Sequence, residues 1–431
     1  MRANVIHTDL NPCGGAEHVA LGTIHALIEM DMDVELTTAR MPDISRLKNA
    51  FGVERVDRLF NQIKKINMLG ELPVASNFEP TLQLAGSQDA NDNARNYDIV
   101  VNTHGDVLPY FLPSFSRNTT VTYCHFPVVI DPIHSRNLSY LGYMASLGLV
   151  DKDIVNGDAN TRNELWQKIR QHYLLMLSNS LVITNSRFSK EAILMTLQKY
   201  KIAVQVQPLV ISPPVNVEAF RRAALFSAER SDYILVISRI NPSKKLENAI
   251  NLAKILKENR IGKGMVIAGS LLDDDYLGND YYHKIMDMVL ALELSDYVTI
   301  EINVGLARLK SLMRNSKVYF HPLRGEPFGV SIVEAMSAGL TPVVPDSGGF
   351  TEFVPKNCQF DSLRSAAGII SSALPAAQVE RIRLSNSVMD FSLSQYQIRF
   401  QSVIRAMLKS SKTELRTLPE ELWWANAKYQ T

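Results

Sequence analysis

The chain has 431 residues, 46% of them hydrophobic and 21% charged, and its 45 Lys and Arg residues nearly balance its 44 Asp and Glu residues. This is the composition of a globular protein of two or three domains, and it leaves little scope for extended disorder. A net charge of +1 argues against a chain-wide electrostatic grip on nucleic acid, and three cysteines (Cys13, Cys124, Cys358) form neither a disulfide framework nor a clustered zinc spacing. No stretch reaches about 18 consecutive apolar residues, and the first residues lack a signal-peptide pattern, so we expect a cytoplasmic protein without a membrane-spanning helix.

Short β-branched runs alternate with longer amphipathic segments in the first half of the chain. The runs read as buried strands, at residues 3–9, 33–39, 97–104, 120–126 and 180–186. Between them, residues 16–30 and 161–177 carry apolar side chains at helical spacing. This alternation predicts an α/β domain with a parallel sheet covered by helices.

The pattern pauses at Pro213 and Pro214, which favour an extended connector, and then resumes. The second series of strands is predicted at residues 232–240, 264–269, 297–303, 317–323 and 341–345. We therefore expect two doubly wound domains, residues 1–213 and 214–414, joined at a proline hinge. The terminal segment, about 415–431, holds two of the three Trp residues and is expected to pack back on the first domain, with a cap on the second domain as the alternative.

The strongest local signal is the loop RGEPFG, which follows a predicted strand and opens directly into the helix VSIVEAMSAG. The first amides of a helix suit a phosphate, and Gly329 allows the backbone to approach an anion. Glu326 and Glu334 are suited to accepting hydrogen bonds from hydroxyl groups of a ribose or a sugar. The pattern predicts a nucleotide-sugar site. The alternative is a glutamate that favours the helix dipole together with a solvated one.

The run EPFGVSIVEAMSAGLTPVV resembles the signature of the retaining GT-B glycosyltransferases of family four, the glycosyl transferases of group 1. The segments ISPPVNVEAF, SRINPSKKLE and FSLSQYQIRF match that family in the same order. The resemblance implies two facing Rossmann-like domains with a deep cleft between them. It also implies transfer of a sugar with retention of configuration, without a metal and without any cofactor beyond the nucleotide-sugar co-substrate.

The resemblance assigns roles to residues of the second domain. Arg239 and Lys244 fill the positions that stabilise the leaving diphosphate, and fixed cations at a strand end suit this task. Lys245 stands where the family often has Gly, so which lysine contacts the diphosphate is left open. The expected donor-binding set is Lys245, Pro327, Phe328, Gly329, Val330 and Glu334, with Glu326 orienting the sugar hydroxyls and Glu334 the ribose.

Two features of the first domain complete the predicted site. Gly14 and Gly15 form a turn after the first strand that lacks the GxGxxG dinucleotide fingerprint. The resemblance places this turn at the donor diphosphate and the acceptor, and a plain tight turn is the alternative. His125 ends a predicted buried strand, where a lone His is more often structural. The resemblance instead has it contact the donor sugar, and YCHFP with CGGAEHV is similar to mannosyltransferases that extend lipid-linked oligosaccharides.

Asp273, Asp274 and Asp275 contain the Asp-x-Asp spacing of metal-dependent glycosyltransferases of another fold. They also precede a predicted helix, whose N-terminus favours acidic side chains. We therefore predict no metal site.

The predicted function is transfer of a hexose, mannose first, from GDP-mannose or a UDP-hexose to a glycan or a lipid-linked acceptor, with no nucleic acid partner. The stretch at 137–150 could meet a lipid-linked acceptor peripherally at the inner membrane face, or be ordinary core and loop. The alternatives are a nucleotide-sugar epimerase or hydrolase, a non-catalytic nucleotide-sugar-binding subunit, and a NAD-dependent oxidoreductase. The missing GxGxxG and the paired glutamates argue against the oxidoreductase.

Overall fold

All ten predicted strand runs are strands in the computed structural model, which describes residues 1–68, 97–104, 120–146, 150, 152–204, 206–226, 230–271 and 276–409. The chain folds into two units. The first comprises Met1–Pro213 together with the C-terminal part that begins at Tyr396, and the second comprises Pro214–Gln395. Within the second unit, the beginning and the end of the segment are joined, since the N–H of Val215 donates to the carbonyl of Phe391 at 2.8 Å.

The sheet of the first unit has seven parallel strands among the described residues, in the order β3-β2-β1-β4-β5-β6-β7. The strands are β1 (Arg2–Ile6), β2 (Asp33–Thr38), β3 (Lys65–Met68), β4 (Ile99–Asn102), β5 (Thr120–Tyr123), β6 (Leu181–Thr184) and β7 (Leu209–Val210). The helices are α1 (Gly15–Ile28), α2 (Ile44–Phe51), α3 (Val53–Phe60), α6 (Ile130–Ser135), α7 (Leu138–Ser146), α8 (Lys152–Asn156), α9 (Ala159–Asn179) and α10 (Arg187–Lys199). The strand order reverses between β1 and β4, as in a Rossmann fold.

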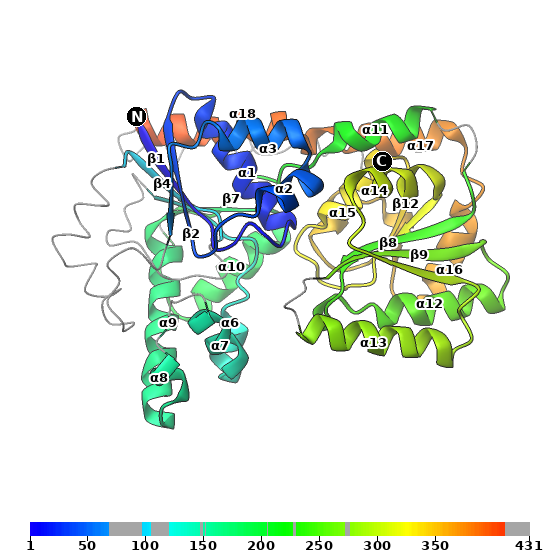
Figure 1. Cartoon of the computed structure of the whole chain (residues 1–431), viewed down its shortest axis with the longest axis horizontal. Helices are drawn as coiled ribbons and strands as arrows, with labels where there is room; N and C mark the ends of the chain where they lie inside the picture. The colour runs from blue at the N-terminus through cyan, green and yellow to red at the C-terminus, as the bar shows by residue number, and fades with distance from the viewer. Residues whose placement is uncertain are drawn as a thin grey trace. The chain divides into compact units, whose positions relative to one another are not determined.

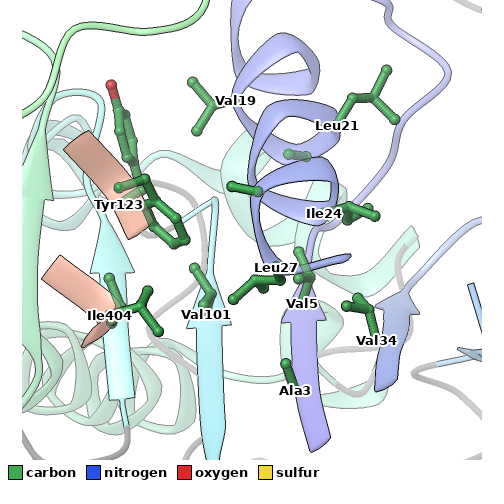
Figure 2. Close-up of a cluster of buried hydrophobic side chains, with 14 of the residues drawn as sticks. Ala3, Val5, Val19, Leu21, Ile24, Leu27, Val34, Val101, Tyr123 and Ile404 are labelled. Carbon is green, nitrogen blue, oxygen red and sulfur yellow. The ribbon is translucent and has the colours of Figure 1, made fainter. Parts of the chain in front are cut away.

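Helices cover both faces of this sheet (Figure 1). On one face the core joins α1, α2 and α3 to the strands, and Figure 2 shows Leu27 of α1 between Val5 of β1 and Val101 of β4. On the other face a second core lies under α6, α7, α9 and α10, with Trp166 and Tyr173 among its buried side chains. The buried strands consist almost entirely of apolar and β-branched residues because both of their faces are covered.

The C-terminal helix α18 (Leu393–Lys409) corrects the predicted domain boundary. We expected the second domain to extend to residue 414, but the described residues from Tyr396 to Lys409 belong to the first unit. Its buried stripe, Tyr396, Phe400, Val403, Ile404 and Met407, is part of the core formed by α1 and the strands. The hydroxyl of Tyr396 lies 2.7 Å from that of Thr23 on α1. The helical spacing shows that one face is buried, but it does not show which sheet that face covers. The expected packing of residues 415–431 lies outside the described residues.

The second unit repeats the doubly wound plan. Its parallel sheet has the order β10-β9-β8-β11-β12-β13 among the described residues. The strands are β8 (Tyr233–Arg239), β9 (Gly264–Ser270), β10 (Val298–Ile302), β11 (Val318–Phe320), β12 (Thr341–Pro345) and β13 (Gln359–Phe360). The helices are α11 (Val217–Phe226), α12 (Glu247–Glu258), α13 (Tyr276–Ala291), α14 (Leu306–Asn315), α15 (Val330–Ser337), α16 (Leu363–Ala373) and α17 (Gln378–Ser387), and the 3-10 turns are η2 (Pro242–Lys244), η3 (Gly349–Glu352), η4 (Lys356–Cys358) and η5 (Met389–Phe391). One core lies under α12, α13 and α16, and another lies under α11, α14 and α15.

Candidate functional site

The two loops at the switch point of the second sheet carry the residues predicted to bind the donor. β8 and β11 are hydrogen-bonded neighbours although β9 and β10 lie between them in the chain. Open parallel sheets bind ligands at the carboxyl ends of their strands beside such a point. β8 ends at Arg239 and leads into η2, and β11 leads into the loop that ends at Gly329.

Lys244 and Glu326 form an ion pair across this switch point. The Nζ of Lys244 lies 2.6 Å from Oε2 of Glu326. Burial by itself would raise the pKa of Glu326, but the charge and hydrogen bond of Lys244 together with the charge of His321 outweigh it, so the pKa lies below its ordinary value. Arg239 contributes in the same direction. Glu326 is therefore ionised at neutral pH and acts only as a hydrogen bond acceptor.

Arg239 and Lys245 are the other two cations of this edge. Both side chains are exposed, and within the described residues neither forms an ion pair. Lys245 has a φ of +53°, the left-handed conformation that glycine adopts most easily. This backbone conformation agrees with the expectation that the position often holds Gly in the family. The geometry brings Lys244, and not Lys245, to the loop that follows β11, carries Glu326 and ends at Gly329, which we call the glutamate loop.

Gly329 begins the helix α15 in a conformation that requires glycine. Its φ is +93°, and a Cβ atom there would lie 2.5 Å from Cδ1 of Ile332. The first N–H groups of α15 have no partners inside the helix and point toward the loop side, where an anion is favoured. Phe328 is buried against Phe353 and Phe391, with ring centroids 5.3 and 5.4 Å away. The aromatic contacts hold the loop in place, and Pro327 precedes them.

Glu334 lies one turn into α15 with a pKa unlike that of Glu326. Burial raises the pKa of Glu334 to about 8, so its carboxyl group is largely protonated at neutral pH. In the part of the chain that the structure describes, this carboxyl group makes no hydrogen bond or ion pair. The two glutamates therefore differ in charge in the free protein, because only Glu326 has a cation beside it.

The structure adds residues at this edge that the sequence did not single out. His321 follows β11, is buried, and has its Nε2 3.9 Å from Oε2 of Glu326, and burial lowers its pKa to about 4. The loop after β12 supports the glutamate loop, since the N–H of Gly349 donates to the carbonyl of Glu326 at 2.9 Å. Gly348 has a φ of +143°, and a Cβ there would lie 2.8 Å from the same carbonyl. The GG pair in PDSGGF was the available signal.

In the first unit, the loop after β1 is held by Glu17. The N–H of Gly14 donates to the carboxylate of Glu17, and Gly15 begins α1. A Cβ on Gly14 would lie 3.0 Å from that carboxylate, so a side chain there would crowd the contact. The other carboxylate oxygen lies 3.4 Å from Nε2 of His7, and both side chains are buried. A buried carboxyl group therefore accepts a hydrogen bond from the first glycine of this turn.

His125 follows β5 and is connected to that loop. Its Nε2 lies 3.1 Å from the carbonyl of Thr103, which can only accept, so Nε2 carries the proton. The Thr103 hydroxyl lies 3.0 Å from Nδ1 of His7, whose ring stacks on His104 at 4.6 Å. Contacts thus run from His125 through Thr103 and His7 to Glu17. The strand-end position of His7 and the spacing of Glu17 from Gly14 were the signals that the sequence reading did not use.

Each unit brings its own predicted residues together. Arg239, Lys244 and Glu326 meet at one edge with α15, and Gly14 and His125 lie at the carboxyl ends of β1 and β5. The three aspartates at 273–275 lie outside the described residues. Among the residues described, no group of three or more His, Cys, Asp or Glu side chains is arranged to hold a metal ion. Within the same ranges, no helix combines the length and apolar character needed to cross a bilayer.

Residues 217–359, which contain the whole switch-point edge of the second unit, match the family of glycosyl transferases group 1. The chain is 28% identical over 276 residues to a GDP-Man:Man(3)GlcNAc(2)-PP-Dol alpha-1,2-mannosyltransferase of Neurospora crassa, which covers 58% of this chain and 48% of that protein. The Homo sapiens enzyme of the same name is 24% identical over 278 residues, covering 58% of this chain and 55% of its own. The chain thus spans about half the length of these relatives.

Solved structures match nearly the whole chain. A glycosyltransferase from Rickettsia africae aligns with 95% of this chain and 99% of its own at 15% identity, with a TM-score of 0.61. Sucrose-phosphate synthase from Thermosynechococcus elongatus aligns with 95% and 100% at 16% identity, with a TM-score of 0.62. With the two Rossmann-like sheets, these matches confirm the predicted GT-B fold class.

Proposed function

We propose, from the premise that residues 217–359 are a glycosyl transferase group 1 segment within a GT-B fold, that the protein is a retaining hexosyltransferase. The observation that carries the proposal is the Lys244–Glu326 pair at the switch point, beside the N-terminus of α15. It places a cation within hydrogen-bond distance of a carboxylate that can accept hydrogen bonds from hydroxyl groups. A nucleotide sugar needs both, one for its diphosphate and one for its sugar.

The proposed donor is GDP-mannose and the proposed acceptor is a lipid-linked oligosaccharide. Both come from the names of the relatives, which are GDP-mannose-dependent mannosyltransferases acting on Man(3)GlcNAc(2)-PP-Dol. The motif similarity of CGGAEHV and YCHFP to such enzymes supports the same choice. A UDP-hexose is the second donor to test.

In the proposed reaction the bond between the anomeric carbon and the diphosphate oxygen breaks, and the acceptor oxygen forms the new bond on the same face of the sugar. The proton of the acceptor hydroxyl passes to the departing diphosphate. Arg239 and Lys244 would neutralise the charge that grows on the leaving diphosphate, together with the amides of Phe328, Gly329 and Val330. Glu326 would accept hydrogen bonds from the sugar hydroxyls and Glu334 from the ribose. The roles of His125 and of the turn at Gly14 and Gly15 as donor contacts stay proposals, as does a reaction without a metal.

The test begins with donor binding and ends with turnover. Purified protein is screened for thermal stabilisation by GDP-, UDP- and ADP-sugars, because a ligand at 100 times its dissociation constant adds about 2.7 kcal/mol of stability. The stabilising donor is then incubated with and without a polyprenyl-diphosphate-linked oligosaccharide. Acceptor-dependent release of nucleoside diphosphate supports the proposal. Equal release of free sugar with and without acceptor indicates a hydrolase, and binding without turnover indicates a binding subunit.

A further inference from the structure

A hollow lies on the first unit between α6 and α9, in the layer of helices. Its volume is about 270 Å³, and we call it the α6–α9 cup. Helices α6 and α9 contact each other there (Figure 1). The cup is lined by Ile133, His134, Arg136, Asn163, Trp166, Gln167 and Arg170. None of the roles assigned above uses any of these residues.

The lining is cationic and has no counter-charge. It includes two arginines and neither Asp nor Glu. Within the described residues, Arg136 and Arg170 form no ion pair, although the guanidinium of Arg170 lies 5.8 Å from the centre of the Tyr200 ring. A third cation lies beside the cup, since Nζ of Lys199 is 3.0 Å from Nε2 of His134. Among the described residues these three positive charges have no acidic partner, and together they produce a local field that attracts an anion.

The remaining polar side chains of the cup each have an N–H group that can donate a hydrogen bond. The ammonium of Lys199 has no lone pair, so Nε2 of His134 must be the acceptor, and the ring then carries its proton on Nδ1. The hydroxyl of Tyr200 also lies 3.0 Å from this Nε2. The amides of Asn163 and Gln167 add N–H donors to the lining. Guanidinium groups surrounded by neutral donors match the oxygens of a phosphate group.

Trp166 gives the cup a fixed wall. Its side chain is buried in the core under α6 and α9, and its ring stacks on Tyr140 with centroids 6.0 Å apart. A wall that is already packed does not have to be ordered when a ligand binds, and this reduces the entropy lost on binding. The polar side chains thus stand on a rigid base formed by two packed helices.

We propose that the α6–α9 cup binds a phosphate or diphosphate group. Two kinds of ligand could supply these phosphate oxygens. One is a free inorganic anion, and the other is the diphosphate that carries a lipid-linked sugar. Only the second source rests on the proposed function, because it makes the cup a contact of the acceptor's diphosphate.

The experiment measures pyrophosphate binding by calorimetry in three proteins. We expect two sites in the wild-type chain, one at the cup and one at the predicted donor edge. In the Arg136→Gln/Arg170→Gln variant, the affinity of the cup site should fall at least ~10-fold and the affinity of the donor site should stay unchanged. Lys244→Met should show the opposite pattern. If the cup variant keeps both sites, the inference is wrong. If Lys244→Met keeps both while the cup variant loses one, the cup stands and the donor assignment is wrong.

Two further variants distinguish the loss of a binding site from the misfolding of a variant. Gln167→Glu places a carboxylate in the cup at an exposed helical position, and we expect it to abolish binding at that site. Arg58→Gln removes an exposed cation from α3, outside the cup, and should change neither site. Repeating the titration with farnesyl diphosphate distinguishes the sources. Tighter cup binding of the farnesyl compound assigns the lipid-linked diphosphate, and equal binding assigns the free anion.

Discussion

The ammonium of Lys244 lies 2.6 Å from a carboxylate oxygen of Glu326, so two side chains that we assign to different parts of one donor neutralise each other in the free protein. Each side chain is about one-fifth exposed, 20% for Lys244 and 19% for Glu326, so an incoming group can still reach both. A diphosphate that binds Lys244 competes with Glu326 for it. We expect Glu326 then to have acceptor capacity for sugar hydroxyls, which couples the two contacts.

Replacing Lys244 tests this coupling. Lys244→Met removes the cation from a mostly buried carboxylate, so the pKa of Glu326 should rise and the leaving diphosphate should lose a contact. We expect kcat/KM for sugar transfer to fall by at least ~10²-fold, the scale of one preorganised charge contact. The measurement is steady-state release of nucleoside diphosphate by the purified, folded variant.

Lys245→Met is the matched control. Its side chain is exposed in the left-handed residue next along the chain. We expect a loss of less than ~10-fold, since an exposed charge contributes little through solvent. A larger loss for Lys245→Met than for Lys244→Met would contradict our assignment and would give the diphosphate contact to Lys245.

The raised pKa of Glu334 predicts that the free energy of unfolding depends on pH. Its pKa is raised by burial to about 8 in the folded protein and is 4.5 for an ordinary glutamate. Between these values the folded protein binds more protons than the unfolded chain, so the free energy of unfolding falls as pH rises and levels off above about pH 8. Glu334→Gln should remove this decline. One pKa unit is worth about 1.4 kcal/mol, so we expect the variant to gain at least ~1 kcal/mol over wild type between pH 5 and pH 8.

Urea denaturation at the two pH values measures the effect. Glu191→Gln, on an exposed position of α10, is the control and should leave the wild-type decline in place. A Glu334→Gln curve parallel to the wild type would show that the carboxyl group is ionised throughout this range.

The positions of most strands could be predicted from the sequence. The runs that became β1, β4, β8 and β11 are strongly β-branched or aromatic and buried on both faces, and such runs are easy to recognise. The missed strands are different. β3 has the sequence KINM at a sheet edge, and β7 and β13 have two residues each. Tertiary pairing, and not local composition, makes these segments strands.

The sequence likewise predicts some features of the candidate site and not others. The turn at Gly329 and the two glutamates could be recognised because a helix N-terminus and its glycine are local features. That Lys244 and not Lys245 reaches Glu326 depends on one left-handed residue, and sequence does not determine that geometry. The contact between His7 and Glu17 was missed for another reason: it joins the end of a strand to a helix through a fold that spacing alone does not reveal.

Glu17 tests whether the first unit's contacts shape its glycine turn. Glu17→Ala removes the acceptor of the Gly14 N–H and the contact of Nε2 of His7. We expect a loss of about 1–3 kcal/mol in the free energy of unfolding and a lower kcat/KM for transfer. Glu17→Gln keeps an acceptor oxygen and should recover most of the stability. Equal losses in both variants would show that the carboxylate charge, and not the hydrogen bond, holds the turn.

Gly329 and Gly325 form a matched pair in the glutamate loop. Both have positive φ, +93° and +80°, but a Cβ at Gly329 would clash with Ile332 and a Cβ at Gly325 would meet nothing within 4 Å. Gly329→Ala should therefore be much more harmful than Gly325→Ala, which carries only the backbone strain of about 1–2 kcal/mol. Thermal unfolding and donor binding measure the two variants, and similar losses would contradict the steric account.

The docking of α18 on the first unit predicts a destabilisation confined to that unit. Phe400 is fully buried in the core with α1 and the strands, so Phe400→Ala should lower the free energy of unfolding by about 3–5 kcal/mol. Ile398 lies on the opposite face of the same helix and is 56% exposed, so Ile398→Ala should change it by less than ~0.5 kcal/mol. Hydrogen exchange read separately on β4 and β11 locates the effect. We expect faster exchange in β4 of the Phe400 variant and no change in β11, because α18 packs on the first sheet although the chain immediately before it belongs to the second unit.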